Sequence, residues 1–272
     1  MVCIFCKQNS ENAIGVEHII PESLGNKEHI LPKGVECDRC NNYFATKIER
    51  PMLELPYFIS ARNRMAVENK KRRVPVDWGM LLSPRGSKIH LRHENYKNPS
   101  IDLLDEQTYQ WLIQQKTFSM IVPANSMPPD DNSQISKFLG KVAPVTLAKI
   151  GLEIEEGLTE VTYNSGLPPL RDYVRYGKGT KFWPHHMRQL YIEDKYFSAE
   201  NISNTFQVLH EYQLFQTTQN AWHLVLVIFG IEFCLNLGEP TTADYRMWLE
   251  MNNQDSPLYG HFNNNGRADP AE

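Results

Sequence analysis

The stretch CIFCKQNSENAIGVEHIIPESLGNKEHILPKGVECDRCN, residues 3–41, decides the fold of the N-terminal part of this chain. It holds two Cys-x-x-Cys pairs, Cys3 with Cys6 and Cys37 with Cys40, on either side of a Glu-His dipeptide. Two thiolates at this spacing reach one tetrahedral metal from a tight turn, and two such pairs close its coordination shell. The sequence therefore predicts a structural Zn²⁺ site, which supplies much of the folding energy of so short a segment. The alternative is two unrelated turns with buried cysteines.

Strand, loop and helix patterns follow one another around the cysteines. Residues 13–20 are apolar and β-branched and are predicted as a strand ending near His18, residues 21–32 as a loop between two prolines, and residues 34–36 as a short second strand. Asn41 follows the last cysteine and is predicted as the N-cap of a helix. Two strands and a helix, clamped by one zinc ion at both ends, make a ββα-metal finger.

The order of these residues resembles the zinc-bearing HNH endonucleases of the ββα-metal superfamily. The resemblance covers about residues 1–50 and rests on the two cysteine pairs, on Glu17-His18 followed by Pro21, and on Asn41. It implies that Glu17 and Asn41 hold a catalytic divalent ion, Mg²⁺ or Mn²⁺. It also implies that His18 is the general base.

Physical chemistry agrees with these implied roles. Carboxylate and amide oxygens, such as those of Glu17 and Asn41, suit a hard divalent ion. His18 titrates near neutrality and can take a proton from an attacking water. Successive side chains of a strand point to opposite faces, so Glu17 and His18 enter one site only where the strand ends or twists. We expect one-metal hydrolysis of phosphodiester bonds.

Two positions depart from the family pattern. The acidic residue is Glu17, where Asp is commoner in the family, and the Asn-Leu pair that usually precedes the second cysteine pair is missing from residues 31–34. Asn26 is the nearest asparagine and is the candidate for orienting the loop. Asn42 competes with Asn41 for the metal, and Asn41 is preferred because it directly follows the cysteine.

Charge is unevenly distributed along the 272 residues, whose net charge is −4. Residues 1–97 carry 16 Lys+Arg against 11 Asp+Glu, while residues 98–272 carry 12 against 21. A basic N-terminal half suits a polyanion, and DNA is the expected partner. The basic residues expected to contact phosphates, or else to form a solvated face, are Lys47, Arg62, Arg64, Lys70, Lys71, Arg72 and Arg73. Since none of them indicates base readout, little sequence specificity is expected of the finger.

The whole chain is predicted to be α+β. The expected segments are the finger over 1–60, a basic extension over 61–122, an α+β domain of unassigned role over 134–262 and a disordered tail over 263–272. Further predicted elements are a helical stretch over 51–67 that breaks at Pro51 or Pro56, a strand over 88–96, a loop over 123–133, a helix over 135–150, and strands or hairpins over 205–217 and 222–237.

Several conspicuous residues are expected to be structural. The neighbours His185 and His186 lie near Arg171 and Arg175 in the sequence, but adjacent histidines rarely ligate one metal. Cys234 is expected to be a buried thiol in a strand, because free cysteine packs as a small hydrophobe. His29 is expected to be exposed in the loop rather than to bind metal.

Cysteine pairing and hydropathy suggest the compartment. No signal peptide is recognised at the start, and the most apolar run, residues 224–231, is too short to cross a bilayer. Cys-x-x-Cys pairs without an export signal favour a metal site in a reducing cytoplasm, so a cytoplasmic protein without a membrane partner is expected.

Three functional readings follow. The resemblance favours a DNA endonuclease whose C-terminal half governs homodimerisation or responds to a protein or small-molecule activator, in phage defence or mobile-element biology. A second reading is a non-catalytic zinc module that binds nucleic acid or a protein partner. A third is an RNase with the same finger.

Overall fold

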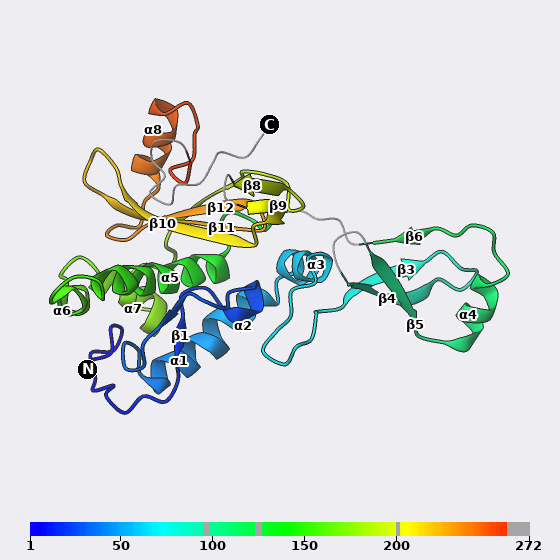
Figure 1. Cartoon of the computed structure of the whole chain (residues 1–272), viewed down its shortest axis with the longest axis horizontal. Coiled ribbons are helices and arrows are strands. Elements are labelled where there is room, and N and C mark those ends of the chain that lie inside the picture. The colour runs from blue at the N-terminus through cyan, green and yellow to red at the C-terminus, as the bar shows by residue number, and fades with distance from the viewer. Residues whose placement is uncertain (95–97, 123–126, 200–201, 260–272) are drawn as a thin grey trace. The chain divides into compact units, whose positions relative to one another are not determined.

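The computed structural model describes residues 1–94, 98–122, 127–199 and 202–259 (Figure 1). It has a mixed architecture of helices and four β-sheets, which confirms the predicted α+β class. Two compact units form: one comprises residues 1–21, 26–52 and 129–272, and the other comprises residues 22–25 and 53–128. The tail predicted to be disordered, residues 263–272, lies outside the described residues.

The finger is built around a two-residue antiparallel ladder in the first unit. Its elements are β1 (Glu17–His18), β2 (Ile30–Leu31), α1 (Asp38–Phe44), η2 (Ala45–Glu49) and α2 (Arg50–Leu53). In β1 and β2, Glu17 pairs with Leu31 and His18 with Ile30. The strand predicted within 13–20 is therefore confined to residues 17–18, and it ends at His18 as the sequence predicted.

Two finer predictions for the finger are wrong. The second strand is at 30–31 and not at 34–36, because Gly34 has φ +92° and the Val35 amide bonds back to the Pro32 carbonyl, which closes a turn. The helix begins at Asp38 with Cys37 in the extended N-cap position, so Asn41 lies within its first turn. The Asn41 amide donates to the Cys37 carbonyl as an ordinary helical donor.

A long helix occupies the middle of the first unit. The helix α5 (Ser133–Gly151) starts at Asn132, whose side chain accepts hydrogen bonds from the Gln134 and Ile135 amides. It contains Pro144 and includes the helix predicted over 135–150. The shorter helices α6 (Gly157–Tyr163) and α7 (Pro168–Tyr176) follow it. In Figure 1, α5 runs between the sheet and the finger, and residues of α5 contact both.

An antiparallel sheet covers α5 in the order β10-β11-β12-β7. Its strands are β7 (His186–Gln189), β10 (His210–Gln216), β11 (Trp222–Ile228) and β12 (Ile231–Asn236). The strands β8 (Tyr196–Ala199) and β9 (Ile202–Gln207) form a separate two-stranded sheet. Val225 and Val227 pack with Trp248 of α8 (Ala243–Met251) on the face away from α5 (Figure 1). Cys234 is a buried thiol in β12, as predicted.

The second unit has its own small sheet, in the order β5-β4-β3-β6. Its elements are η1 (Glu22–Leu24), α3 (Pro56–Arg64), β3 (Asp77–Leu81), β4 (Ser87–His93), β5 (Pro99–Leu103), α4 (Glu106–Leu112) and β6 (Met120–Ile121). Pro56 opens α3, so the predicted helical break falls there. The core of the second unit is formed by Leu81, Ile89 and Leu91.

Among the described residues, no helix combines the length and the apolar character needed to cross a membrane.

Candidate active site and zinc centre

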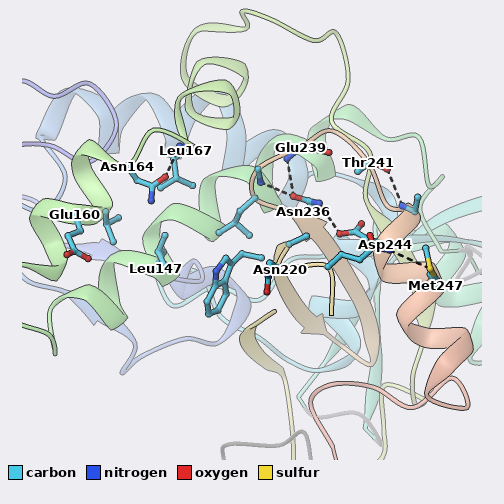
Figure 2. Close-up of a pocket in the computed structure, with 18 residues that line it drawn as sticks. Leu147, Glu160, Asn164, Leu167, Asn220, Asn236, Glu239, Thr241, Asp244 and Met247 are labelled. Atoms are coloured by element: carbon cyan, nitrogen blue, oxygen red, sulfur yellow. Dashed lines mark hydrogen bonds between the residues drawn. The ribbon is translucent and has the colours of Figure 1, made fainter. Parts of the chain in front are cut away.

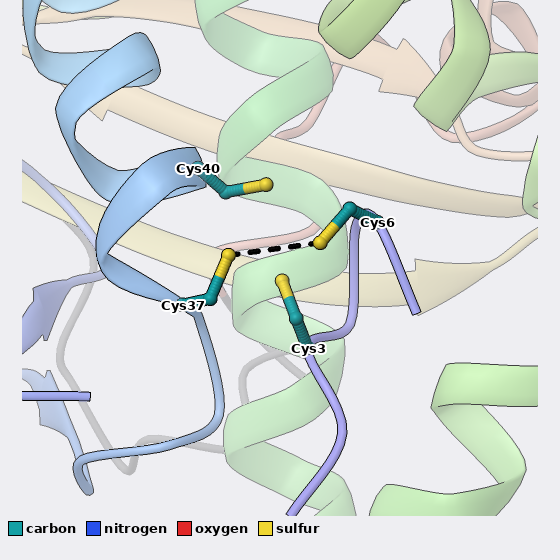
Figure 3. A group of neighbouring side chains, drawn as sticks. All are labelled: Cys3, Cys6, Cys37 and Cys40. Atoms are coloured by element: carbon teal, nitrogen blue, oxygen red, sulfur yellow. Dashed lines mark hydrogen bonds between the residues drawn. The ribbon is translucent and has the colours of Figure 1, made fainter. Parts of the chain in front are cut away.

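The four paired cysteines converge on one point (Figure 3). Cys3 and Cys6 come from the N-terminal turn, Cys37 is the N-cap of α1, and Cys40 lies in its first turn. Their Sγ atoms all lie within 4.8 Å of one another. Within the described part of the chain, no other group of three or more His, Cys, Asp or Glu side chains gathers in this way. Four thiols so placed match the donor set of a closed, tetrahedral zinc site.

The thiols of this cluster differ in their electrostatics. A hydrogen bond from Cys40 lowers the pKa of Cys3 to about 4, whereas burial raises the pKa of Cys6 to about 11 and the hydrogen bond with Cys3 raises that of Cys40. The Nε of Arg175, on α7, donates to the Cys40 Sγ at 3.2 Å, and its guanidinium lies over the Tyr43 ring at 4.2 Å from the centroid. Because four thiolates and one Zn²⁺ leave a net charge of −2, a buried arginine beside them offsets part of that charge.

Glu17 and His18 occupy different environments although they are neighbours in β1. The Glu17 side chain is only 5% exposed, whereas His18 is half-buried. The Oε1 of Glu17 forms an ion pair with the Nζ of Lys141, which comes from the middle of α5. The Glu17 carboxylate is thus directed inward, and β1 ends at His18, where the neighbouring side chains are no longer bound to the alternation of a strand.

Lys141 is the centre of a buried charge cluster. It is fully buried, and its Nζ lies 2.8 Å from Glu49 Oε1 and donates to the His18 carbonyl at 3.1 Å. Burial alone lowers the pKa of Lys141, but Glu17, Glu49 and Glu36 outweigh it, so the pKa is raised and the ammonium stays charged. Burial raises the pKa of Glu17, and burial together with the charge of Glu17 raises that of Glu36 well above its ordinary value.

The asparagines of the finger hold its backbone together. Asn41 donates from Nδ2 to the Val16 carbonyl at 3.1 Å, which ties α1 to the residue before β1. Asn26 is 1% exposed, donates to the Ile20 and His29 carbonyls, and accepts from the Glu28 and His29 amides. It therefore fixes the loop between the two strands, the role that the sequence suggested for it.

The basic residues differ in their access to solvent. Lys47 is exposed on η2 of the first unit. In the second unit, the run Lys70, Lys71, Arg72 and Arg73 is exposed on a turn that the Asn69 side chain closes, and Arg64 is half-buried. Arg62 is 7% exposed and burial lowers its pKa to about 10, so the expectation that it faces a phosphate does not hold in this conformation.

The remaining candidate histidines lie outside the cysteine cluster. His29 is exposed and its ring lies 5.4 Å from that of Tyr212. His185 is 4% exposed between the Phe182 and Phe233 rings, and burial lowers its pKa to about 4. Neither residue belongs to a cluster of metal-ligating side chains in the described parts of the chain.

Residues 3–54 match the family model described as HNH endonuclease. The finger is an HNH domain. The matched segment contains the cysteine cluster, the Glu-His dipeptide and Glu49, but Lys141 and Arg175, which contact it, lie far beyond its end. No curated protein and no solved structure matches the chain.

A cavity of about 740 Å³ lies elsewhere in the first unit, between α5, α6, the end of β12 and α8 (Figure 2). Its walls carry the carboxylates of Glu160, Glu239 and Asp244, and no lysine or arginine is among the described residues that line it. Asp244 is held by His223 at 3.1 Å and by Asn236 at 3.2 Å. An acidic wall repels a phosphodiester, so this cavity does not suit a nucleic acid backbone.

Proposed function

We propose that this protein is a metal-dependent endonuclease that hydrolyses DNA phosphodiester bonds through its HNH domain. The observation that supports it most is the position of His18. It stands half-buried on β1, which pairs with β2 and accepts a hydrogen bond from Lys141 of α5, within the segment that matches the HNH endonuclease family.

In the proposed reaction, His18 is the general base that takes a proton from the attacking water. Its imidazole is suited to this near neutral pH, and its backbone is held on both sides, by the β2 ladder and by Lys141. A base held in one geometry loses less entropy in reaching the transition state.

Glu17 and Asn41 are proposed to hold Mg²⁺ or Mn²⁺. The two oxygen donors suit a hard ion. A carboxylate has lone pairs for more than one partner, so Glu17 can bind a metal ion while its Oε1 contacts Lys141. Asn41 uses its Nδ2 on Val16, and its amide oxygen has no hydrogen bond within the described part of the chain. Bound there, the ion would supply charge stabilisation for the scissile phosphate and the departing 3′ oxygen.

DNA contact is proposed for Lys47 on the HNH domain, and for Arg64 and the turn Lys70–Arg73 on the second unit. These side chains are exposed or half-buried, and their attraction for phosphate is independent of base sequence. We further propose that residues 129–259 control the nuclease through homodimerisation or an activator, because α5 and α7 contact the HNH domain directly. The proposed setting, phage defence or mobile-element biology, is supported by analogy with the family.

The test is incubation of zinc-loaded protein with labelled DNA and with labelled RNA of the same sequence, in Mg²⁺, Mn²⁺ or EDTA. The proposal predicts cleavage of DNA with either metal and none in EDTA. Cleavage of RNA alone would make the protein an RNase. Binding of nucleic acid without cleavage of either polymer would contradict the proposal and favour a non-catalytic zinc module.

A further inference from the structure

Within the described residues, the polar contacts of the Lys141 side chain are with the HNH domain, although Lys141 lies 92 residues beyond Glu49 and 123 beyond His18. Its ammonium meets the Glu17 carboxylate from β1, the Glu49 carboxylate from η2 and the carbonyl of His18. Lys141 is fully buried on α5, so these contacts are part of the packed interior and are not a solvent-exposed surface ion pair.

We propose that Lys141 is a positioning residue of the HNH active site. It holds β1 so that His18 is presented in one orientation, and it acts through Glu17 and the His18 backbone without touching the substrate. The inference rests on the proposed nuclease function and adds to it a residue from outside the segment that matches the family.

Charge balance supports this role. A buried ammonium is costly unless it is paired, and so are buried carboxylates. Glu17, Glu36 and Glu49 come from three places in the HNH domain, and Lys141 is the cation that they share. Removing it would leave the Glu17 and Glu49 carboxylates without the cation that joins them, which loosens β1.

Geometry supports it as well. The ladder of β1 and β2 is only two residues long, so the backbone of β1 has few bonds of its own to hold it in place. The bond from Lys141 to the His18 carbonyl fixes the residue that carries the imidazole, and the bond to Glu49 ties that point to the helical segment that follows the cysteines. Charge-assisted bonds of this kind are the stronger ones.

The experiment compares Lys141→Met with Lys149→Met, a matched control on the same helix whose side chain is 41% exposed and pairs with Glu153 at 3.9 Å. Lys141→Arg tests whether the charge restores the function. Three quantities are measured on the full-length protein: zinc content, kcat and KM for DNA cleavage, and amide exchange of residues 13–31, which include the bond from the Ile19 amide to the His29 carbonyl.

Lys141→Met is expected to lower kcat about 10- to 100-fold, with KM and zinc content kept, and to speed exchange in residues 13–31. Lys141→Arg is expected to recover part of the loss, and Lys149→Met to resemble the wild type. A kcat for Lys141→Met equal to that of Lys149→Met would overturn the inference. If Lys141→Met does not fold, the double variant with Glu49→Gln, which removes one of the stranded charges, is measured instead and judged by the same outcomes.

The exchange measurement separates this inference from the proposed function. If the wild type cleaves no nucleic acid, the nuclease proposal fails. Faster exchange in residues 13–31 of Lys141→Met, and not of Lys149→Met, then still supports Lys141 as the residue that fixes β1. Unchanged exchange would overturn it.

Discussion

Acid is expected to destabilise this protein through His185. The ring is 4% exposed, neither of its nitrogens has a hydrogen-bond partner in the described part of the chain, and burial lowers its pKa to about 4. The unfolded chain takes up a proton below about pH 6.5, while the folded protein does not until about pH 4. The contribution of His185 to stability is therefore complete above pH 6.5 and is lost as the pH falls toward 4.

The size of this loss follows from the two pKa values. Each pH unit between them is worth about 1.4 kcal/mol, so the folded state loses about 3 kcal/mol relative to the unfolded state by pH 4. In His185→Leu, an apolar side chain of similar size takes the place of the ring between Phe182 and Phe233, and this loss is absent.

The assay is urea denaturation of the wild type and of His185→Leu at steps between pH 7 and pH 4.5. Loss of zinc at low pH affects both proteins, so the difference between their free energies of unfolding isolates His185. As the pH falls, the free energy of unfolding of His185→Leu is expected to rise relative to that of the wild type. If the two free energies of unfolding fall in parallel with pH, His185 does not have the lowered pKa described above and is protonated or hydrogen-bonded in the folded protein.

Three further predictions concern the zinc centre and the core. Removal of zinc by a strong chelator is expected to remove on the order of 10 kcal/mol of folding free energy and to unfold residues 1–54. Circular dichroism measures this unfolding, and an unchanged spectrum and melting curve would argue against a structural metal. Arg175→Met, which removes the donor to Cys40 Sγ, is expected to weaken zinc binding about 10-fold in competition with a chelator dye, and equal affinity would count against that bond. Glu232→Gln removes a fully buried charge that pairs with the partly exposed Arg188 at 2.6 Å, and it is expected to lower the free energy of unfolding by about 3 kcal/mol in urea denaturation, whereas a loss below about 1 kcal/mol would contradict a stabilising ion pair.

Local patterns in the sequence predicted what depends on neighbouring residues. The cysteine cluster follows from the Cys-x-x-Cys spacing, and the helix predicted over 135–150 lies within α5. The start of α1 was missed because asparagine is the common N-cap, whereas here Cys37 takes the extended N-cap conformation beside the other cysteines. The position of β2 was missed because Gly34 turns the chain where a strand was expected.

Long-range contacts could not be predicted from one sequence. Lys141 resembles any lysine of an amphipathic helix, and only the fold brings it to Glu17. Arg175 reaches Cys40 across 135 residues. The burial of Arg62 was missed for the same reason, since a basic residue at that place in the sequence looks like a surface residue until α3 is packed. The segment boundaries 1–60, 61–122 and 134–262 and the assignment of Glu17, His18 and Asn41 to catalysis stay predictions.

The proposed role of His18 as general base is tested by the rate of DNA cleavage under single-turnover conditions, measured for His18→Ala beside His29→Ala. His29 is the matched control, because it is an exposed histidine of the same finger that lies outside the proposed site. The account predicts that His18→Ala loses at least about 100-fold in rate while both variants keep their zinc and their fold, and that His29→Ala cleaves like the wild type. A wild-type rate in His18→Ala would show that His18 is not the general base.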